Sequence, residues 1–170
     1  LLEGVFDVEE LLKAAEHGFW IVVSRHEQLE MIEQCSSAMR GLNVWLKLET
    51  GMNRLGLDGS LACEYISRLC ATKAVSKVSS MTHLACADVE GDDFSAIQIE
   101  RLMNATRGLD CELSFCNSAG ILSVKRPRSD WARLGIAMYG VNPVPGSLFA
   151  LEPVMELKSQ IFDVKEVKEG

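Results

Sequence analysis

Residues 47–56 read Lys47-Leu48-Glu49-Thr50-Gly51-Met52-Asn53-Arg54-Leu55-Gly56. The apolar residues that lead into this stretch predict a β-strand over 43–48, and two glycines bound the loop that follows it. This arrangement would place Arg54 at the carboxyl end of a strand, the side on which parallel βα folds carry their chemistry. An isolated arginine in such a loop is usually a solvated surface group, so its role depends on what accompanies it.

On both sides of this stretch, short runs typical of β-strands alternate with amphipathic helical segments. The runs recur about every 25 to 35 residues, as in βαβ units, and the alternation predicts an α/β fold with a parallel sheet or barrel. Asp7 and Ser24 each begin a capping-box pattern with a glutamate three residues later. The expected strands cover 19–23, 43–48, 78–84, 111–116 and 131–133, and further helices cover 58–71 and 94–106. The inward faces of these two helices are expected to hold Leu61, Tyr65, Ile66 and Leu69, and Ile97, Ile99 and Leu102.

Composition excludes several classes of protein. Of the 170 residues, 48% are hydrophobic and 24% charged, as in a folded globular protein. A formal net charge of -7 disfavours nucleic-acid binding, because an acidic surface repels phosphates. The apolar run 19–23 is far shorter than the roughly 20 residues that cross a bilayer, so no membrane span is expected. The six cysteines form no C-x-x-C pair, and we expect them to be reduced and mostly buried, which favours a cytoplasmic location.

The pattern changes after Gly140. Residues 142–150 are rich in turn-forming prolines and glycine, and 154–167 alternates apolar and polar residues with no helix between. We therefore expect 1–141 to be a partial barrel, 142–150 a linker, and 151–170 the start of a C-terminal β domain. The chain opens on Leu1 rather than methionine and stops within the alternating pattern, so we expect an internal fragment of a longer protein.

Four further motifs follow residues 47–56. They are Thr82-His83-Leu84-Ala85 with Ala87-Asp88, Phe115-Cys116-Asn117-Ser118-Ala119, Arg133-Leu134-Gly135-Ile136-Ala137-Met138-Tyr139-Gly140, and Leu151-Glu152-Pro153-Val154-Met155. In this order and spacing the set resembles the motifs of alanine racemases. The resemblance implies an incomplete (β/α)8 TIM-type barrel that binds pyridoxal 5'-phosphate. It also implies a homodimeric parent isomerase that interconverts L-alanine and D-alanine by two-base proton transfer, for cell-wall peptidoglycan or for alanine catabolism.

The resemblance assigns roles to four side chains of the site. Arg54 would contact the phenolic oxygen of the cofactor and the substrate carboxylate, a task suited to a planar guanidinium. Arg133 would face the pyridine nitrogen, where a permanently charged donor disfavours ring protonation and weakens the ring as an electron sink. His83 would orient Arg133, although such a histidine is also often a satisfied core residue. Lys47 would match a lysine that some family members carbamylate to steady Arg54, the alternative being an ordinary salt-bridged lysine.

The phosphate of the cofactor would bind where two late loops meet. Asn117 and Ser118 follow one expected strand, and Gly135 and Ile136 follow the next, so backbone amides and the serine hydroxyl can converge on one phosphate. Asn117 and Ser118 can also cap a helix, a role that does not exclude phosphate binding. No metal site is predicted.

The groups that move the substrate proton are expected to lie outside this chain. By the resemblance they are a lysine near the amino terminus and a tyrosine from the partner's second domain, whereas Tyr65 and Tyr139 are expected to be structural. The isolated chain is therefore expected to be inactive. A pyridoxal-phosphate carrier protein or a barrel-type amino-acid decarboxylase is the alternative, and the segment 154–170 together with the motif around Arg133 disfavours it. Intact site residues disfavour a degenerate binding module.

Overall fold

A single parallel sheet organises the chain. The structure is a computed structural model that describes residues 1–123, 129–144, 146 and 149–169. Its main strands lie in the order β1 (Ile21–Val23), β2 (Leu42–Glu49), β4 (Val75–Met81), β5 (Leu113–Cys116) and β6 (Trp131–Ala132). The short β3 (Leu57–Asp58) pairs with the end of β2, and all of these pairings are parallel. The predicted α/β class and the five predicted strands are confirmed.

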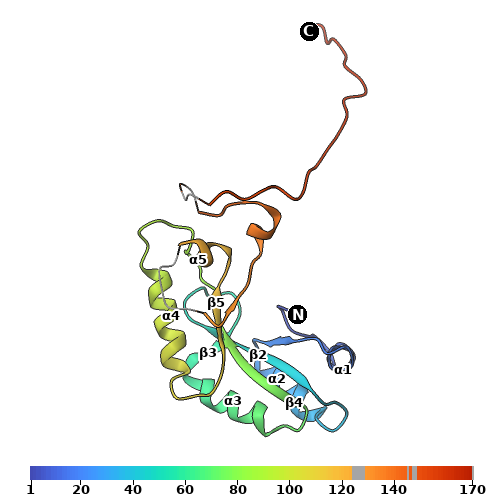
Figure 1. Cartoon of the computed structure of the whole chain (residues 1–170). Helices are drawn as coiled ribbons and strands as arrows, with labels where there is room; N and C mark the ends of the chain where they lie inside the picture. The colour runs from blue at the N-terminus through green and yellow to red at the C-terminus, as the bar shows by residue number, and fades with distance from the viewer. Residues whose placement is uncertain (124–128, 145, 147–148, 170) are drawn as a thin grey trace.

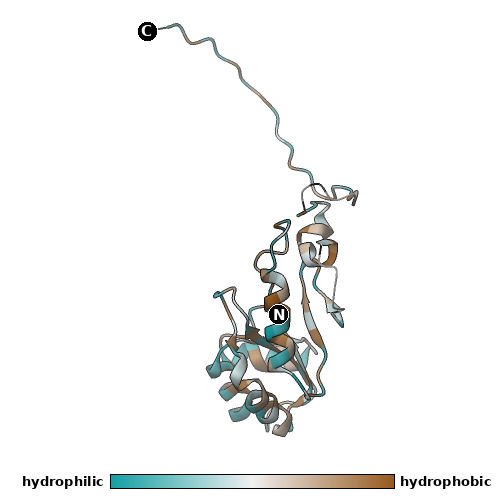
Figure 2. Ribbon diagram, turned by 90° about the vertical axis from the view of Figure 1, so that its left-hand side faces the viewer, coloured by the Kyte–Doolittle hydropathy of each residue, from teal (hydrophilic) through white to brown (hydrophobic). Residues whose placement is uncertain are grey.

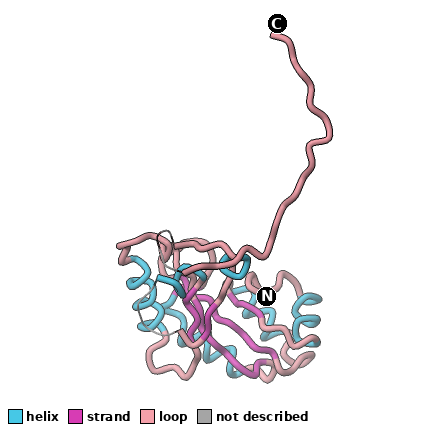
Figure 3. The backbone as a smooth tube through the Cα atoms, turned by 45° about the horizontal axis from the view of Figure 1, so that its top comes forward, coloured by secondary structure: helices cyan, strands magenta, loops and turns pink. Residues whose placement is uncertain are grey.

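Helices connect the strands and flank the sheet, as the cyan and magenta segments of Figure 3 show. They are α1 (Val8–Glu16), α2 (His26–Gln34), α3 (Ala62–Ala71), α4 (Phe94–Ala105) and α5 (Ser118–Ser123), with 3-10 turns η1 (Gly59–Leu61) and η2 (Ile136–Tyr139). The path from strand through helix to the next parallel strand is the βαβ unit that the spacing predicts. None of the described helices is long and apolar enough to cross a membrane.

The sheet is curved so strongly that its first and last strands approach each other. Trp20 directly precedes β1, Trp45 lies on β2, and Trp131 opens β6. The ring centroids are 5.7 Å apart for Trp20 and Trp45, 5.7 Å for Trp20 and Trp131, and 6.0 Å for Trp45 and Trp131. Such curvature in a parallel sheet with outer helices is that of a segment of a βα barrel.

The two predicted capping boxes have different outcomes. Asp7 caps α1, because its carboxylate accepts a hydrogen bond from the Glu10 amide at 2.8 Å. The prediction for Ser24 was wrong, because α2 begins one residue later and its N-cap is Arg25, whose side chain makes no capping bond. Instead Gln28 reaches back, and its Oε1 accepts a hydrogen bond from the Ser24 amide at 2.9 Å. A buried glutamine therefore replaces the expected serine–glutamate pair.

The predicted inward faces of two helices are correct except at their polar edges. Tyr65, Ile66 and Leu69 of α3 are buried, and so are Ile99 and Leu102 of α4. Leu61 and Ile97 are instead 39% and 43% exposed, so their predicted burial was wrong. Leu61 belongs to the tighter turn η1, which rotates its side chain off the face of α3, while Gln98 takes the inward position beside Ile97.

The predicted burial of the cysteines was also wrong. All six are free thiols, but four are only partly buried and two are exposed. The exposed cysteines, Cys63 and Cys70, lie on the outer side of α3, where the helix faces solvent.

Residues 151–169 form no helix or strand, so the strands expected within 154–167 are not formed here. Figures 1 and 2 show this segment as an extended trace leading away from the folded body, with hydrophilic and hydrophobic stretches alternating along it. Leu157 and Phe162 are 100% and 98% exposed. A strand requires hydrogen bonds to a neighbouring strand. Within the described part of the chain, the backbone of 151–169 makes one such bond, from the Val154 amide to the Tyr139 carbonyl at 3.3 Å. The division at 142–150 and 151–170 stays a prediction, and residues 145, 147, 148 and 170 fall outside the described part.

Candidate functional site

A cavity of about 550 Å³ lies at the carboxyl ends of the strands. Every residue that the sequence predicts for the site lines it: Lys47, Arg54, His83, Asn117, Ser118, Arg133, Gly135 and Ile136. These residues lie at or just after the ends of β2, β4, β5 and β6. Because the strands are parallel, their carboxyl ends share one edge of the sheet, and the loops that follow them meet there.

The loop that carries Arg54 is shaped by glycines and a carboxylate. Gly51 has a φ of +137° and Gly56 a φ of +142°, a region that side chains rarely allow. A Cβ on Gly56 would lie 2.7 Å from the amide nitrogen of Glu49, so the loop returns directly onto β2. The Glu49 carboxylate accepts a hydrogen bond from the Gly51 amide, which closes the start of the loop. Arg54 is exposed at the tip, where its guanidinium can reach a ligand.

Arg133 is held at the floor of the cavity by its neighbours on the sheet. One of its terminal nitrogens donates to the carbonyl of Thr82 at 2.5 Å, and the other donates to the hydroxyl of Ser114. Burial lowers the pKa of Arg133 to about 10, which still leaves the guanidinium charged at neutral pH. The predicted orienting role of His83 stays a prediction, because the described hydrogen bonds of this guanidinium go to the other two residues.

The hydroxyl of Ser118 gathers two backbone amides from the loop after β6. Its oxygen accepts from Gly135 at 2.9 Å and from Ala137 at 3.3 Å. Asn117 caps the short helix α5, because its Oδ1 accepts from the Gly120 amide at 2.8 Å while its Nδ2 donates to the Leu84 carbonyl. The helix-capping alternative for Asn117 is therefore realised. The hydroxyl of Ser118 and the amides of the loop after β6 thus lie together at one end of the cavity, with the amides bonded to the serine oxygen.

Positive charge dominates this cavity. Lys47 is only 6% exposed, and burial, followed by the charges of Arg54 and Arg133, lowers its pKa. Within the described part of the chain, no hydrogen bond or ion pair reaches the Lys47 ammonium. Burial and the same cations lower the pKa of His83 to about 4, so this imidazole is neutral at pH 7. Lys47, Arg54 and Arg133 outnumber Glu3 and Asp88, the two acidic residues of the lining, and this excess of positive charge favours an anionic ligand.

The sequence did not single out several residues that also shape the cavity. Leu2 and Glu3 line it from the amino-terminal segment, and Asp88 lines it from the loop after β4. Glu3 comes close because the buried amide of Gln28 donates to its carbonyl at 3.2 Å. The residues before Gly4 carried no motif. Their place is visible only in three dimensions, where the Val22 amide donates to the Leu1 carbonyl and extends the parallel ladder beyond β1.

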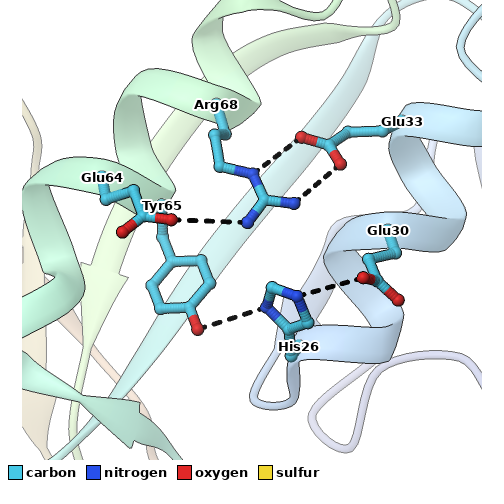
Figure 4. A network of polar contacts seen from close by, with 6 residues as sticks. All are labelled: His26, Glu30, Glu33, Glu64, Tyr65 and Arg68. Carbon is cyan, nitrogen blue, oxygen red and sulfur yellow. Dashed lines mark hydrogen bonds and ion pairs between the residues drawn. The ribbon is translucent and has the colours of Figure 1, made fainter.

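A second polar cluster lies on the outer side of the molecule and serves packing. In Figure 4 Arg68 of α3 forms a two-pronged pair with Glu33 of α2, at 2.9 and 2.8 Å. Tyr65 meets His26 at 3.3 Å, and His26 meets Glu30 at 3.1 Å. None of these residues lines the cavity, so they join neighbouring helices. Among the described residues no group of histidine, cysteine and acidic side chains could hold a metal ion.

The fold and the cavity together define a class: a βα-barrel segment with a cationic ligand site at the carboxyl ends of its strands. The family model described as "Alanine racemase, N-terminal domain" matches residues 1–143. The chain belongs to this alanine racemase family.

Individual relatives agree with this assignment. The chain is 43% identical to "Alanine racemase" of Azoarcus sp. (strain BH72) and 40% identical to "Alanine racemase, catabolic" of Pseudomonas putida, matching in each case 100% of this chain and 48% of the relative. The crystal structure of biosynthetic alanine racemase from Pseudomonas aeruginosa superimposes with a TM-score of 0.81 at 31% identity, covering 89% of this chain and 44% of that one. The chain thus spans about half the length of the curated relatives it matches.

Proposed function

We propose that this chain is the part of an alanine racemase that binds pyridoxal phosphate and the substrate carboxylate. One observation carries the proposal: the hydroxyl of Ser118 and the amide of Gly135 meet at 2.9 Å in the same cavity that holds Lys47, Arg54 and Arg133. A ligand with a phosphate at one end and a carboxylate at the other suits this distribution of donors and cations.

The residues present fit the cofactor. The cavity of about 550 Å³ lies within the roughly 300–1,000 Å³ typical of small-molecule sites. Its three cations, Lys47, Arg54 and Arg133, exceed the two acidic lining residues, Glu3 and Asp88. A Cβ on Gly135 would lie 3.9 Å from the Ser118 hydroxyl, so the backbone there leaves this end of the cavity open. These features support a bound phosphate without showing one.

Each residue then has a chemical task. Ser118, Gly135 and Ile136, next to the cap Asn117, would hold the phosphate, and Arg133 would donate a hydrogen bond to the ring nitrogen. Since the Arg133 pKa is about 10, this donor does not give up its proton at pH 7, and it would disfavour protonation of the ring nitrogen. When bound, pyridoxal phosphate supplies an electron-withdrawing ring that acidifies the Cα proton of an attached amino acid. Arg54 would bind the substrate carboxylate and His83, neutral at pH 7, would support Arg133.

The proposal places both acid/base groups, a lysine and a tyrosine, outside residues 1–170. It includes a homodimeric parent protein and a cytoplasmic location, which the free thiols support. Production of D-alanine for peptidoglycan and alanine catabolism are both open as its role. Lys47 is a candidate for carbamylation, because a buried amine with a lowered pKa is more often unprotonated and attacks carbon dioxide as the neutral form. A carbamate there would supply the anion that Arg54 lacks.

The decisive experiment uses the full reading frame that contains this chain. The protein is expressed with pyridoxal phosphate, and D-alanine formation from L-alanine is measured for the wild type, Arg54→Ala and Ser118→Ala. Arg54→Ala should lose most of the activity and keep the cofactor absorbance, whereas Ser118→Ala should weaken cofactor binding. Cofactor binding with no racemisation of any amino acid would instead favour a carrier protein, and release of carbon dioxide would favour a decarboxylase.

A further inference from the structure

A buried glutamine connects two of the loops that form the cavity. Gln98 lies on α4, its side chain is 0% exposed, and it does not line the cavity itself. Its Oε1 accepts a hydrogen bond from the Ala85 amide at 2.8 Å. Its Nε2 donates to the His83 carbonyl at 2.9 Å and to the Thr50 hydroxyl at 3.2 Å. One amide thus holds the loop after β4 and the start of the loop after β2.

Thr50 passes this restraint on to both arginines. Its hydroxyl meets the Thr82 hydroxyl at 2.7 Å, and its carbonyl accepts from Arg101, also on α4, at 2.8 Å. The carbonyl of Thr82 in turn accepts from Arg133. Thr50 directly precedes the loop that carries Arg54, so a buried hydrogen-bonded chain runs from the base of that loop to Arg133. Buried networks in which every member is satisfied fix a single geometry.

We propose that Gln98 is a positioning residue that sets the distance between Arg54 and the His83–Arg133 side of the cavity. A glutamine is needed because the position requires two donors and one acceptor on a side chain of this length. A glutamate cannot donate to both oxygens, and an apolar side chain leaves the Ala85 amide and the His83 carbonyl without the partner that Gln98 supplies. Loss of the amide therefore removes the bond from Gln98 to the start of the Arg54 loop, while the bonds of Thr50 to Thr82 and Arg101 remain.

This inference rests on the proposed function where it concerns substrate. Arg54 binds the carboxylate in that proposal, whereas the cofactor phosphate is held by Ser118 and Gly135, on loops that Gln98 does not touch. Displacement of the Arg54 loop should therefore weaken substrate binding while cofactor binding is retained. A residue that only stabilises the fold would affect both in proportion or neither.

The test compares variants of the full-length protein that contains this chain. Gln98→Met removes the amide at nearly constant length, and Thr50→Val removes only the hydroxyl. Each should raise KM for alanine about ten-fold or more, because small misplacements of a substrate-binding group are costly, and each should leave the cofactor dissociation constant within two-fold of wild type. Thr50→Ser keeps the hydroxyl and should restore the wild-type KM. The rise in KM of the double variant should be smaller than the product of the two single rises, since the bond between Gln98 and Thr50 is lost in both single variants.

Thr106→Val is the matched control. Thr106 lies at the end of the same helix, is 6% exposed, and donates to the Leu102 carbonyl at 2.9 Å, away from the cavity. This variant should lower stability and leave KM unchanged. An unchanged KM in Gln98→Met, or an equal rise in Thr106→Val, would overturn the inference.

A second measurement separates this inference from the proposed function. Amide hydrogen exchange of residues 50–56 should become faster in Gln98→Met, while exchange of residues 113–118 on β5 stays as in wild type. Unchanged exchange at 50–56 overturns the positioning role whether or not the protein racemises alanine. A wild type that does not racemise alanine, together with faster exchange in the variant, refutes the proposed function and supports the positioning role.

Discussion

Substitution of Gly56 by alanine tests whether the Arg54 loop depends on a close approach of two backbones. Gly56 has a φ of +142°, and a Cβ there would lie 2.7 Å from the Glu49 nitrogen and 2.9 Å from the Leu48 carbonyl carbon. Both contacts are to the backbone of β2, so no flexible side chain can move aside. The strained φ alone costs about 1–3 kcal/mol, and relief of the clash requires that β3 move away from β2. We expect a total loss of about 2–4 kcal/mol in the free energy of unfolding.

Gly18→Ala is the control for the backbone strain alone. Gly18 has a φ of +66°, and a Cβ there would meet nothing within 4 Å. We expect it to cost about 1–2 kcal/mol, the usual penalty of a left-handed residue with a side chain. Urea unfolding of both variants, followed by circular dichroism, gives the two free energies. Equal losses would show that the approach of Gly56 to β2 does not constrain the loop, and the reasoning about the Arg54 loop would fail.

Three further predictions concern charged groups. Glu33→Gln should lower the free energy of unfolding at pH 7 by about 0.5–1 kcal/mol. Because Arg68 lowers the pKa of Glu33, the ion pair stabilises the fold fully above the ordinary glutamate pKa and loses this effect as pH falls through the lowered pKa of Glu33. A difference in stability between variant and wild type that is the same at pH 3 as at pH 7 would contradict this prediction. Since the pKa of His83 is lowered to about 4, its NMR signals should not titrate from pH 8 to 5.5. The free energy of unfolding should decrease as pH falls below about 6.5, because the unfolded chain binds a proton at this histidine before the folded protein does. A titration midpoint of the His83 signals near pH 6.5 would refute the prediction. Lys47→Met should leave the melting temperature unchanged or higher, because it removes a buried charge. It should also raise the pKa of His83, which the charge of Lys47 helps to lower. A large loss of stability would show that the Lys47 ammonium has a stabilising partner in the folded protein.

The regular part of the fold could be predicted from the sequence because its signal is local. Apolar runs such as 43–48 form strands with the predicted neighbours, since a buried parallel strand requires continuous apolar residues. The two-residue strand β3 could not be predicted, because its pairing depends on where the loop of Gly56 returns. The strands expected within 154–167 are not formed, because an alternating pattern of apolar and polar residues becomes a strand only where a neighbouring strand supplies hydrogen bonds.

The site could be predicted only for residues in the motifs. Arg54, Ser118 and Arg133 lie where parallel strands bring their loops together, and the resemblance named them. Gln98 could not be found in this way, because a glutamine among apolar residues on a helix is usually assigned to the solvent side. Its burial follows from three hydrogen bonds to segments distant in sequence, and no local pattern reports such bonds.

The contact between Trp20 and Trp131 has a consequence for the order in which this chain folds. Trp20 directly precedes the first strand of the sheet and Trp131 opens the last, so the contact cannot form until nearly all of the barrel segment has been synthesised. Contacts of such long sequence separation slow folding and leave apolar strands exposed on the nascent chain. Trp20 and Trp45 therefore stay partly solvated until the last strand brings Trp131 into contact with them. In a stopped-flow refolding experiment the change in tryptophan fluorescence should be slower than the change in the helical circular dichroism signal. The difference between the two rates would report how long after helix formation the contact between Trp20 and Trp131 forms.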